Sequence, residues 1–238
     1  MVYRMNKLFS ISIMGVLERY SFIKEMLKKL PAHTNLILDR AHLGCWQTAK
    51  QAWNSYTDAP YHMVLQDDIL ICDEFEQIVT NIINAAPNRF ISLYSLRNVK
   101  PKKNDHWATR NETTAQGLIM PVPMIKEWMA WVNEYCLEKP HSISDTDDLR
   151  MDLWMEFTGN RCWFVFPHII QHIGTKSALY GTTHVLPSPY YTNDTKKLLE
   201  TDWTKGLSNP SFGRTHYSVE FKLLKPEYLL MKSSMKGH

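Results

Sequence analysis

Apolar runs alternate with amphipathic stretches through roughly the first ninety residues of the chain. Short apolar runs are typical of buried strands, and they predict strands at residues 8–14, 35–39, 61–65 and 89–94. Apolar residues at helical spacing between these runs predict helices at residues 21–30 and 44–56 and from about residue 73 onward. Strands and helices that alternate with short links form parallel sheets covered by helices. The predicted fold class is therefore α/β, a Rossmann-like, mostly parallel sheet flanked by helices.

The second half of the chain has a less regular pattern. Residues 97–115 are polar and predict a long loop, a kind of segment that often serves as a lid or a binding loop. A strand at 117–120, helices at 123–136 and 147–157, and a strand at 161–166 follow. After Gly174 the segments are short and rich in turns. We therefore expect one domain over residues 1–180 and an irregular extension over residues 181–238 that packs on it.

The composition is that of an ordinary globular protein. Hydrophobic residues make up 44% and charged residues 21% of the 238 positions, which argues against a disordered chain. No apolar run reaches membrane-spanning length, and the first residues lack a small-residue cleavage site. The four cysteines are far apart and form no CxxC pair, which favours reduced thiols. We expect a cytoplasmic protein without a membrane span.

The net charge of +3 is unevenly distributed along the chain. Residues 195–238 hold eight Lys and Arg against four Asp and Glu, so this basic tail carries the positive excess. A basic segment can attract a polyanionic partner. An excess as small as this is more typical of an ordinary solvated surface.

Two adjacent carboxylates, Asp67 and Asp68, end the third predicted strand. Ligands of open α/β sheets bind beyond the carboxyl ends of the strands. Carboxylate oxygens suit Mg²⁺ or Mn²⁺, and such an ion can neutralise the charge on a departing diphosphate. The alternative is a turn that enters a helix, where aspartate caps free amide groups.

Residues 171–177, with the sequence QHIGTKS, form a second candidate group. The neutral imidazole of His172 can join carboxylates on Mn²⁺. Lys176 and Ser177 can contact phosphate oxygens. The alternative for His172 is an ordinary hydrogen-bonded core or surface residue.

Acidic residues also open the helix predicted at residues 147–157, where Asp145, Asp147 and Asp148 lie close together. Carboxylates at this position interact favourably with the positive end of the helix dipole. The functional alternative is a general base, or a group that positions an acceptor hydroxyl.

Arg19 and Asp39 follow the first and second predicted strands. Arginine can bind a phosphate and aspartate a ribose hydroxyl, although each also suits an ordinary salt bridge. The phosphate-binding patterns GxGxxG and GxxxxGK[ST] do not occur, which argues against a kinase or a dehydrogenase. Trp107, in the polar segment, is a candidate for stacking on an acceptor.

Six segments together resemble a known family of enzymes. SISIMGVLERY, NLILDRAHLGCWQTAKQAW and YHMVLQDDILICDEF resemble the nucleotide-binding half of a GT-A-type glycosyltransferase. TTAQGLIMP, DTDDLRMDLW and FPHIIQHIGTKSAL resemble its later glycine strand, acidic motif and C-terminal motif. The pattern is similar to the lipooligosaccharide-type family 25 enzymes, and more so to small glycosyltransferases of tailed phages and prophages. The resemblance covers about residues 8–180.

The resemblance implies a role for each candidate residue. It implies that Asp68 and His172 bind Mn²⁺ or Mg²⁺, and that Asp148, together with Asp147, lies on the acceptor side. Contacts to the donor nucleotide or the lining of its pocket are implied for Arg19, Asp39, Gly44, Trp46, Thr48, Asp67, Lys176 and Ser177. The sequence departs from the family pattern at two places. Gln66 stands where many relatives have an acid, and GVLER at residues 15–19 replaces the common His-Pro-Ser-Arg.

The implied activity is transfer of a hexose or pentose from a UDP-sugar to a hydroxyl acceptor. Phage relatives imply a hydroxymethylated pyrimidine in DNA as the acceptor, which the basic residues of 97–110 and of the tail suit. The competing acceptor is a cell-surface glycan. Two other classes stay open, a metal-dependent nuclease or phosphotransferase and a non-catalytic nucleic-acid-binding protein.

Overall fold

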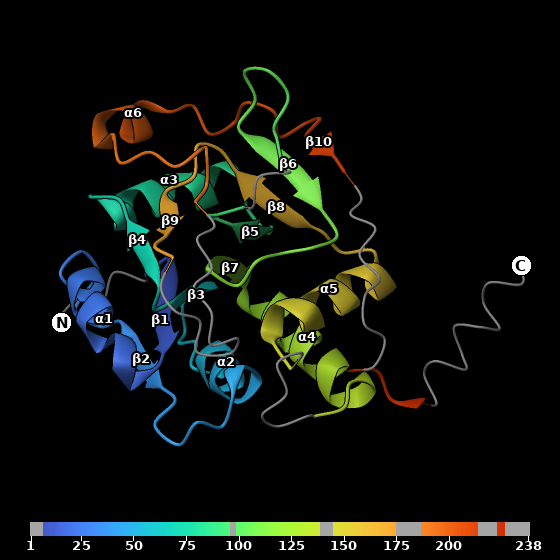
Figure 1. The fold of residues 1–238 in the computed structure, drawn as a ribbon. Helices are drawn as coiled ribbons and strands as arrows, with labels where there is room; N and C mark the ends of the chain where they lie inside the picture. The colour runs from blue at the N-terminus through green and yellow to red at the C-terminus, as the bar shows by residue number, and fades with distance from the viewer. Residues whose placement is uncertain (1–6, 96–98, 139–144, 175–186, 214–222, 227–238) are drawn as a thin grey trace, which may run out of the picture.

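The computed structural model describes residues 7–95, 99–138, 145–174, 187–213 and 223–226. A single sheet with the strand order β10-β6-β8-β5-β7-β3-β1-β2 forms its centre (Figure 1). The strands are β1 (Phe9–Gly15), β2 (Asn35–Leu38), β3 (Tyr61–Gln66), β5 (Phe90–Ser92), β6 (Trp107–Arg110), β7 (Gly117–Pro121), β8 (Cys162–Val165) and β10 (Ser211–Phe212).

The sheet is mixed. The pairs β2–β1, β1–β3, β5–β8 and β6–β10 are parallel, whereas β7 runs antiparallel between β3 and β5, and β6 runs antiparallel to β8. Because β1, β2 and β3 are parallel, their carboxyl ends lie at one edge of the sheet, as the sequence predicts. The predicted α/β class is confirmed, but β6, β7 and β10 run opposite to the other strands, which the pattern did not indicate.

Helices cover both faces of the sheet (Figure 1). The helical segments are η1 (Leu17–Arg19), α1 (Tyr20–Leu27), α2 (Cys45–Asn54), α3 (Phe75–Ala85), α4 (Val122–Tyr135), α5 (Asp147–Thr158) and α6 (Thr195–Glu200). Side chains of α1, α3 and α6 pack into one core with alternate residues of β1 and β3. Side chains of α2, α4 and α5 form the second core on the other face. Among the described helices, none combines the length and apolar character needed to cross a membrane.

Three sequence predictions need correction. The helix predicted from Ser21 to Leu30 begins earlier, through η1, and ends at Leu27, before Pro31. The polar segment 97–115 contains strand β6, because Trp107 and Ala108 are buried between β8 and β10. The extension contributes α6 and β10 to the described structure, and Leu198 and Trp203 are buried in the first core.

A second, two-stranded sheet lies next to the end of β3. Strand β4 (Ile69–Ile71) begins directly after Asp68 and pairs antiparallel with β9 (Ile170–His172). In this register Ile69 lies opposite His172. The sequence pattern predicts neither strand, because each is only three residues long. The pairing brings residues near position 68 and position 172 together.

Candidate functional site

Asp67, Asp68 and Arg19 form a buried charge cluster at the carboxyl end of β3. The Arg19 Nη1 atom donates to Asp67 Oδ1 at 2.7 Å and to Asp68 Oδ2 at 2.9 Å. The backbone N–H of Val16 donates to Asp67 Oδ2 at 2.8 Å. Asp67 is 3% and Asp68 7% exposed, so one guanidinium partly compensates two buried carboxylates. Arg19 thus forms the salt bridge that the sequence left as the alternative, and its contact to a donor phosphate stays a prediction.

Gly15 explains how the segment after β1 reaches this cluster. A Cβ atom at Gly15 would lie 2.5 Å from both Cβ and Oδ2 of Asp67. No larger residue fits without a shift of the backbone or of the aspartate. The glycine at position 15 thus allows Asp67 to pack against the end of β1.

The β4–β9 pairing places His172 beside Asp68. The Nε2 atom of His172 lies 3.4 Å from Asp68 Oδ2, although the two residues are 104 positions apart. The backbone N–H of Ile173 donates to the carbonyl oxygen of Asp68 at 3.0 Å, which fixes the two segments. Gly174 donates its N–H to Nδ1 of His172 at 3.2 Å, so the proton of a neutral ring lies on Nε2 and faces Asp68. The structure thus brings together two residues that the resemblance assigns to one metal site, and metal binding itself stays a prediction.

The two adjacent aspartates have opposite pKa shifts. Burial raises the pKa of Asp67, and the charge of Arg19 and the Val16 hydrogen bond reverse only part of this increase. Burial also acts to raise the pKa of Asp68, but the hydrogen bond from His172 and the charges of Arg19 and His172 outweigh it and lower this pKa. Asp68 is therefore the more firmly ionised carboxylate of the pair.

The fit of a divalent cation can be judged from Asp68 itself. Its Oδ1 atom is buried and has no hydrogen-bond partner among the residues that the structure describes, which is unusual for a carboxylate oxygen and is expected of a ligand atom. Among the described residues, no group of three or more His, Cys, Asp or Glu side chains is arranged to hold a metal. Mg²⁺ commonly takes only one or two protein carboxylates and completes its coordination with substrate phosphates and water. Asp68 fits such an ion when a diphosphate supplies the remaining oxygen atoms. His172 could join it through Nε2 only in the other tautomer, with the proton on Nδ1 and without the hydrogen bond from Gly174.

The acidic residues at the start of α5 form a second cluster. Asp147 is 1% exposed, and its Oδ2 accepts a hydrogen bond from Trp53 Nε1 at 3.3 Å. Burial and the neighbouring charge of Asp148 raise the pKa of Asp147 to about 7. Asp148 is less buried, and its Oδ1 accepts from the Thr146 hydroxyl and from the Leu149 N–H. Burial raises the pKa of Asp148 as well, so this cluster holds a proton more readily than Asp68.

A buried arginine holds this second cluster in place, and the sequence reading did not identify it. The Arg150 side chain is fully buried, pairs with Asp145 and donates from Nη2 to the Leu137 carbonyl oxygen at 2.8 Å. Its guanidinium carbon lies 4.3 Å from the ring centre of Trp46, whose backbone N–H donates to the Asp145 carbonyl oxygen. The sequence feature that could have identified Arg150 is its position between two apolar residues, Leu149 and Met151, of a predicted helix.

Trp46 and Thr48 are predicted to line the donor pocket, and the structure places both in buried positions. The Trp46 ring is 1% exposed and packs on Arg150 and Trp128. The hydroxyl of Thr48 donates to the Gly44 carbonyl oxygen at 3.1 Å. Any effect of these two residues on a donor would act through the position of α2. Their role stays a prediction.

Asp39 shapes the loop that precedes α2. Its two carboxylate oxygens accept from Leu43 N–H at 2.8 Å and from Gly44 N–H at 3.0 Å. Gly44 has a φ of 101°, a conformation that favours glycine. Asp39 thus has a structural task, and its proposed contact to a ribose stays a prediction. Lys176 and Ser177 lie outside the described residues.

Trp107 cannot stack on an acceptor in this structure. Its side chain is 0% exposed, and its Nε1 donates to the Trp203 carbonyl oxygen at 2.7 Å. The expectation was wrong because the segment around Trp107 is an inner strand of the sheet and not a loop.

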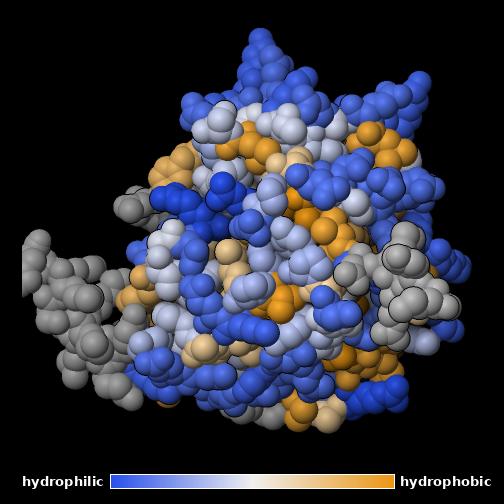
Figure 2. Space-filling model, turned by 180° about the vertical axis from the view of Figure 1, so that it is seen from behind, coloured by the Kyte–Doolittle hydropathy of each residue, from blue (hydrophilic) through white to orange (hydrophobic). Residues whose placement is uncertain are grey.

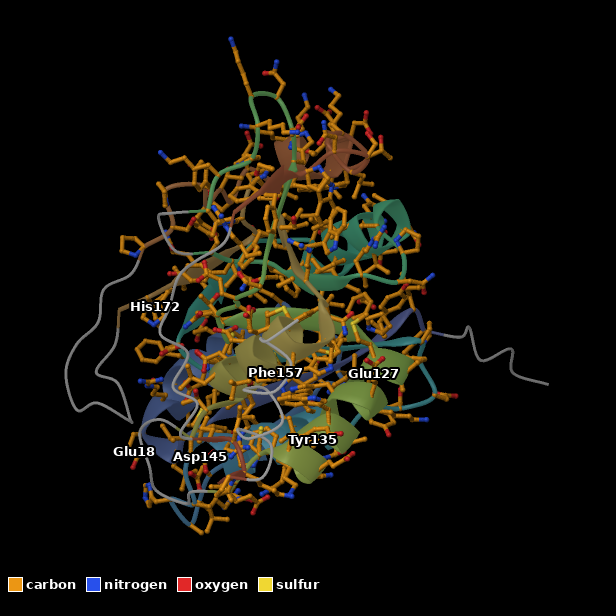
Figure 3. All side chains as sticks on the ribbon, turned by 90° about the vertical axis from the view of Figure 1, so that its right-hand side faces the viewer. Glu18, Glu127, Tyr135, Asp145, Phe157 and His172 are labelled. Carbon is orange, nitrogen blue, oxygen red and sulfur yellow. The ribbon has the colours of Figure 1, made fainter. Side chains whose placement is uncertain are left out.

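Figure 3 labels one residue of each cluster, His172 and Asp145, together with Glu18, the neighbour of Arg19 in the sequence. All three labels lie in the left half of that view. Glu127, on α4, lies towards the opposite side. The structure therefore defines an α/β protein with a buried carboxylate–histidine site and a second, largely buried acidic cluster that holds a proton more readily.

Comparisons with known proteins add little to this description. No family model matches the chain, and no curated protein matches it. A solved structure with a weak similarity is that of a Drosophila β-1,4-galactosyltransferase 7 mutant in complex with manganese, UDP-galactose and xylobiose. Sequence identity is 9%, the match covers 88% of this chain and 82% of that chain, and the TM-score is 0.34. A similarity this weak carries no conclusion about the function of the chain.

Proposed function

We propose that the chain is a GT-A-type glycosyltransferase, which transfers a hexose or pentose from a UDP-sugar to a hydroxyl acceptor with the help of Mn²⁺ or Mg²⁺. The observation that carries the proposal is the meeting of Asp68 and His172 at the carboxyl edge of the sheet. The partnerless Oδ1 atom of Asp68 supports it independently. Both features follow from the chain's own geometry.

In this proposal the first cluster, Arg19, Asp67 and Asp68 with His172, binds the donor. Asp68 and His172 would hold the cation, which when bound supplies positive charge opposite the leaving diphosphate. Arg19 keeps Asp68 ionised and adds a fixed positive charge beside it, where phosphate oxygens are favoured. Asp67 holds Arg19 and the segment after β1 in place.

In this proposal the second cluster, Asp147 and Asp148 at the start of α5, acts on the acceptor. In the transfer, the bond from the sugar C1 to the diphosphate oxygen breaks and a bond from C1 to the acceptor oxygen forms. If the reaction inverts the anomeric centre, Asp148 takes the proton that the acceptor hydroxyl releases. If it retains the configuration, Asp148 positions the substrates. Asp148 is favoured over Asp147, because Asp147 is buried and already bound to Trp53.

We propose a hydroxymethylated pyrimidine in DNA as the acceptor, with a cell-surface glycan as the competing choice. Trp107 no longer supports the DNA acceptor, because its ring is buried. Support comes instead from exposed lysines of the segment before β6 and of the extension. An acceptor rich in phosphate suits such residues better than a neutral glycan does.

Hydrolysis of a UDP-sugar in the presence of Mn²⁺ tests the proposal. Asp68→Asn is expected to lower the rate at least about a hundredfold, as loss of a charge-stabilising group does, and to weaken Mn²⁺-dependent binding of UDP measured by calorimetry. Asp58→Asn, an exposed aspartate outside both clusters, serves as the matched control and should leave both values unchanged. Equal rates for Asp68→Asn and wild type would refute the proposal. Phosphodiester cleavage without a sugar donor would favour the nuclease alternative.

The variant Asp148→Asn tests the role of the second cluster independently of the first. Turnover should fall sharply while UDP and Mn²⁺ bind as in the wild type, because the substitution leaves Asp68 and His172 untouched. The asparagine side chain of this variant keeps an oxygen that can accept from Leu149 N–H, so the start of α5 should fold normally. Full transfer activity in this variant would remove Asp148 from the proposed mechanism.

A further inference from the structure

Lysines from two segments far apart in the sequence meet at one end of the molecule. The backbone N–H of His106 donates to the Lys205 carbonyl oxygen at 3.1 Å. The Nζ atom of Lys102 donates to the Asn209 carbonyl oxygen at 2.7 Å. The Ser211 hydroxyl donates to the Lys100 carbonyl oxygen at 2.5 Å. Figure 1 shows α6 and the segment before β6 at the same end, and Figure 2 shows that hydrophilic residues dominate there.

A depression with a volume of about 510 Å³ lies on this end. Lys196, Lys197 and Lys205 line it together with His106. All three lysines are exposed, and no ion pair found among the described residues involves any of them. Their ammonium groups are thus available to an anionic ligand.

Three carboxylates, those of Asp194, Glu200 and Asp202, line the same depression and offset the charge of its three lysines. Asp194 caps α6 by accepting from Lys197 N–H at 3.1 Å. Asp202 Oδ1 accepts from the N–H of Thr204 at 3.1 Å and from its hydroxyl at 2.6 Å. These hydrogen bonds fix the two carboxylates in place, but both carboxylates keep their negative charge. Glu200 is the remaining acidic residue that lines the depression, and it weakens attraction of an anion.

An exposed aromatic ring extends the lysine-rich end along the sheet edge. Phe212 of β10 is 53% exposed, and the Arg161 guanidinium carbon lies 4.0 Å from its ring centre. Phe212 pairs with Thr109, two residues after Trp107, so its side chain lies on the face of the sheet that carries Trp107. Trp203, near Lys205 in sequence, covers Trp107 on that face. Positive charge and a stacking surface thus lie together.

We propose that this lysine surface, defined by Lys100, Lys102, Lys103, Lys196, Lys197 and Lys205, binds the phosphodiester backbone of a nucleic acid. A row of ammonium groups beside an exposed ring suits a chain of phosphates with bases that can stack. A neutral glycan offers no charge to these lysines. The inference rests on the proposed function only in naming the acceptor class, because binding here needs neither a sugar donor nor a cation.

Fluorescence anisotropy with unmodified 20-nucleotide DNA, single-stranded and duplex, measures binding between about 50 and 300 mM salt, a range over which phosphate contacts weaken steeply. The triple variant Lys196→Ala, Lys197→Ala, Lys205→Ala should reduce the slope of log K against log salt by about 2 to 3, at 0.7 to 0.9 per lost phosphate contact. Glu200→Gln should bind more tightly than the wild type. The triple variant Lys24→Ala, Lys28→Ala, Lys126→Ala changes the net charge equally, elsewhere on the surface, and should keep the wild-type slope.

Two results would overturn the inference: no binding at 50 mM salt, or the same slope in both triple variants. Circular dichroism shows whether each variant is folded. Glu200→Gln is a second test, because its DNA affinity should rise whereas that of the triple variant should fall. The outcome is separate from that of the proposed function. Loss of UDP-sugar hydrolysis in Asp68→Asn without DNA binding would reject only the lysine surface. DNA binding with unchanged hydrolysis in Asp68→Asn would reject only the glycosyltransferase.

Discussion

Replacing Asp147 by asparagine should make the protein more stable at alkaline pH. Burial and the charge of Asp148 raise the pKa of Asp147 from 3.8 to about 7. Below pH 3.8 the carboxyl group is protonated in both the folded and the unfolded chain, so its raised pKa does not change the free energy of unfolding. As the pH rises towards 7, the unfolded chain releases the proton and the folded chain keeps it. The free energy of unfolding therefore falls across this window and is constant above it.

The size of the effect follows from the shift. A difference of about 3 pKa units corresponds to about 4 kcal/mol. The side chain is 1% exposed, so solvent screens little of this cost. Asparagine keeps an oxygen that accepts from Trp53 Nε1 and has no charge to desolvate. The gain in unfolding free energy of Asp147→Asn over wild type should thus be about 4 kcal/mol larger at pH 8 than at pH 4.

Urea unfolding of both proteins at the two pH values measures this difference. Asp58→Asn removes a charge from an exposed position and should show no such change between pH 4 and pH 8. A difference below about 1 kcal/mol, less than one pKa unit, would refute the reasoning. The carboxylate of Asp147 would then be solvated, and it would compete with Asp148 for the role of base.

Further substitutions test the packing around the site. Gly15→Ala should cost about 1 to 3 kcal/mol in a thermal unfolding scan, because the new Cβ lies 2.5 Å from Asp67; an unchanged midpoint would contradict this. Arg19→Met should cost about 3 kcal/mol in urea unfolding at pH 7, because it leaves buried carboxylates without their cation; a gain in stability would show that the pair is protonated. Trp107→Phe should cost about 2 kcal/mol through a cavity and the lost bond to Trp203 and should leave DNA affinity unchanged; weaker binding at full stability would restore Trp107 as an acceptor contact.

The strands and helices of the first half could be predicted because their apolar residues follow one period over a whole element. In β1, Phe9, Ile11 and Ile13 alternate with residues of the other face, and this alternation is visible in the sequence. The carboxyl-edge position of Asp67 and Asp68 follows directly, since β1 and β3 are parallel neighbours. The sequence could therefore locate the acidic half of the site.

The rest of the site depends on contacts that no local pattern encodes. Strands β4 and β9 are too short for a period, and only their pairing with each other makes them strands. The segment 97–115 is polar overall, yet its β6 part is buried because the extension covers it. Arg150 is charged at a core position and is compensated by Asp145, which precedes the helix. Each of these depends on a partner distant in sequence or outside the element.

The opposite pKa shifts of Asp68 and Asp147 divide the two carboxylate clusters into different tasks. Both side chains are buried, so desolvation acts on both in the same direction. Asp68 has Arg19 and His172 as neighbours and stays ionised, which a cation ligand requires. Asp147 has another carboxylate as its neighbour, and the pair retains a proton up to about pH 7, which suits proton transfer in the neutral range. Under the proposed function, Asp68 would supply the lasting negative charge that a cation ligand needs. The Asp147–Asp148 pair would supply a group that titrates where an acceptor hydroxyl loses its proton.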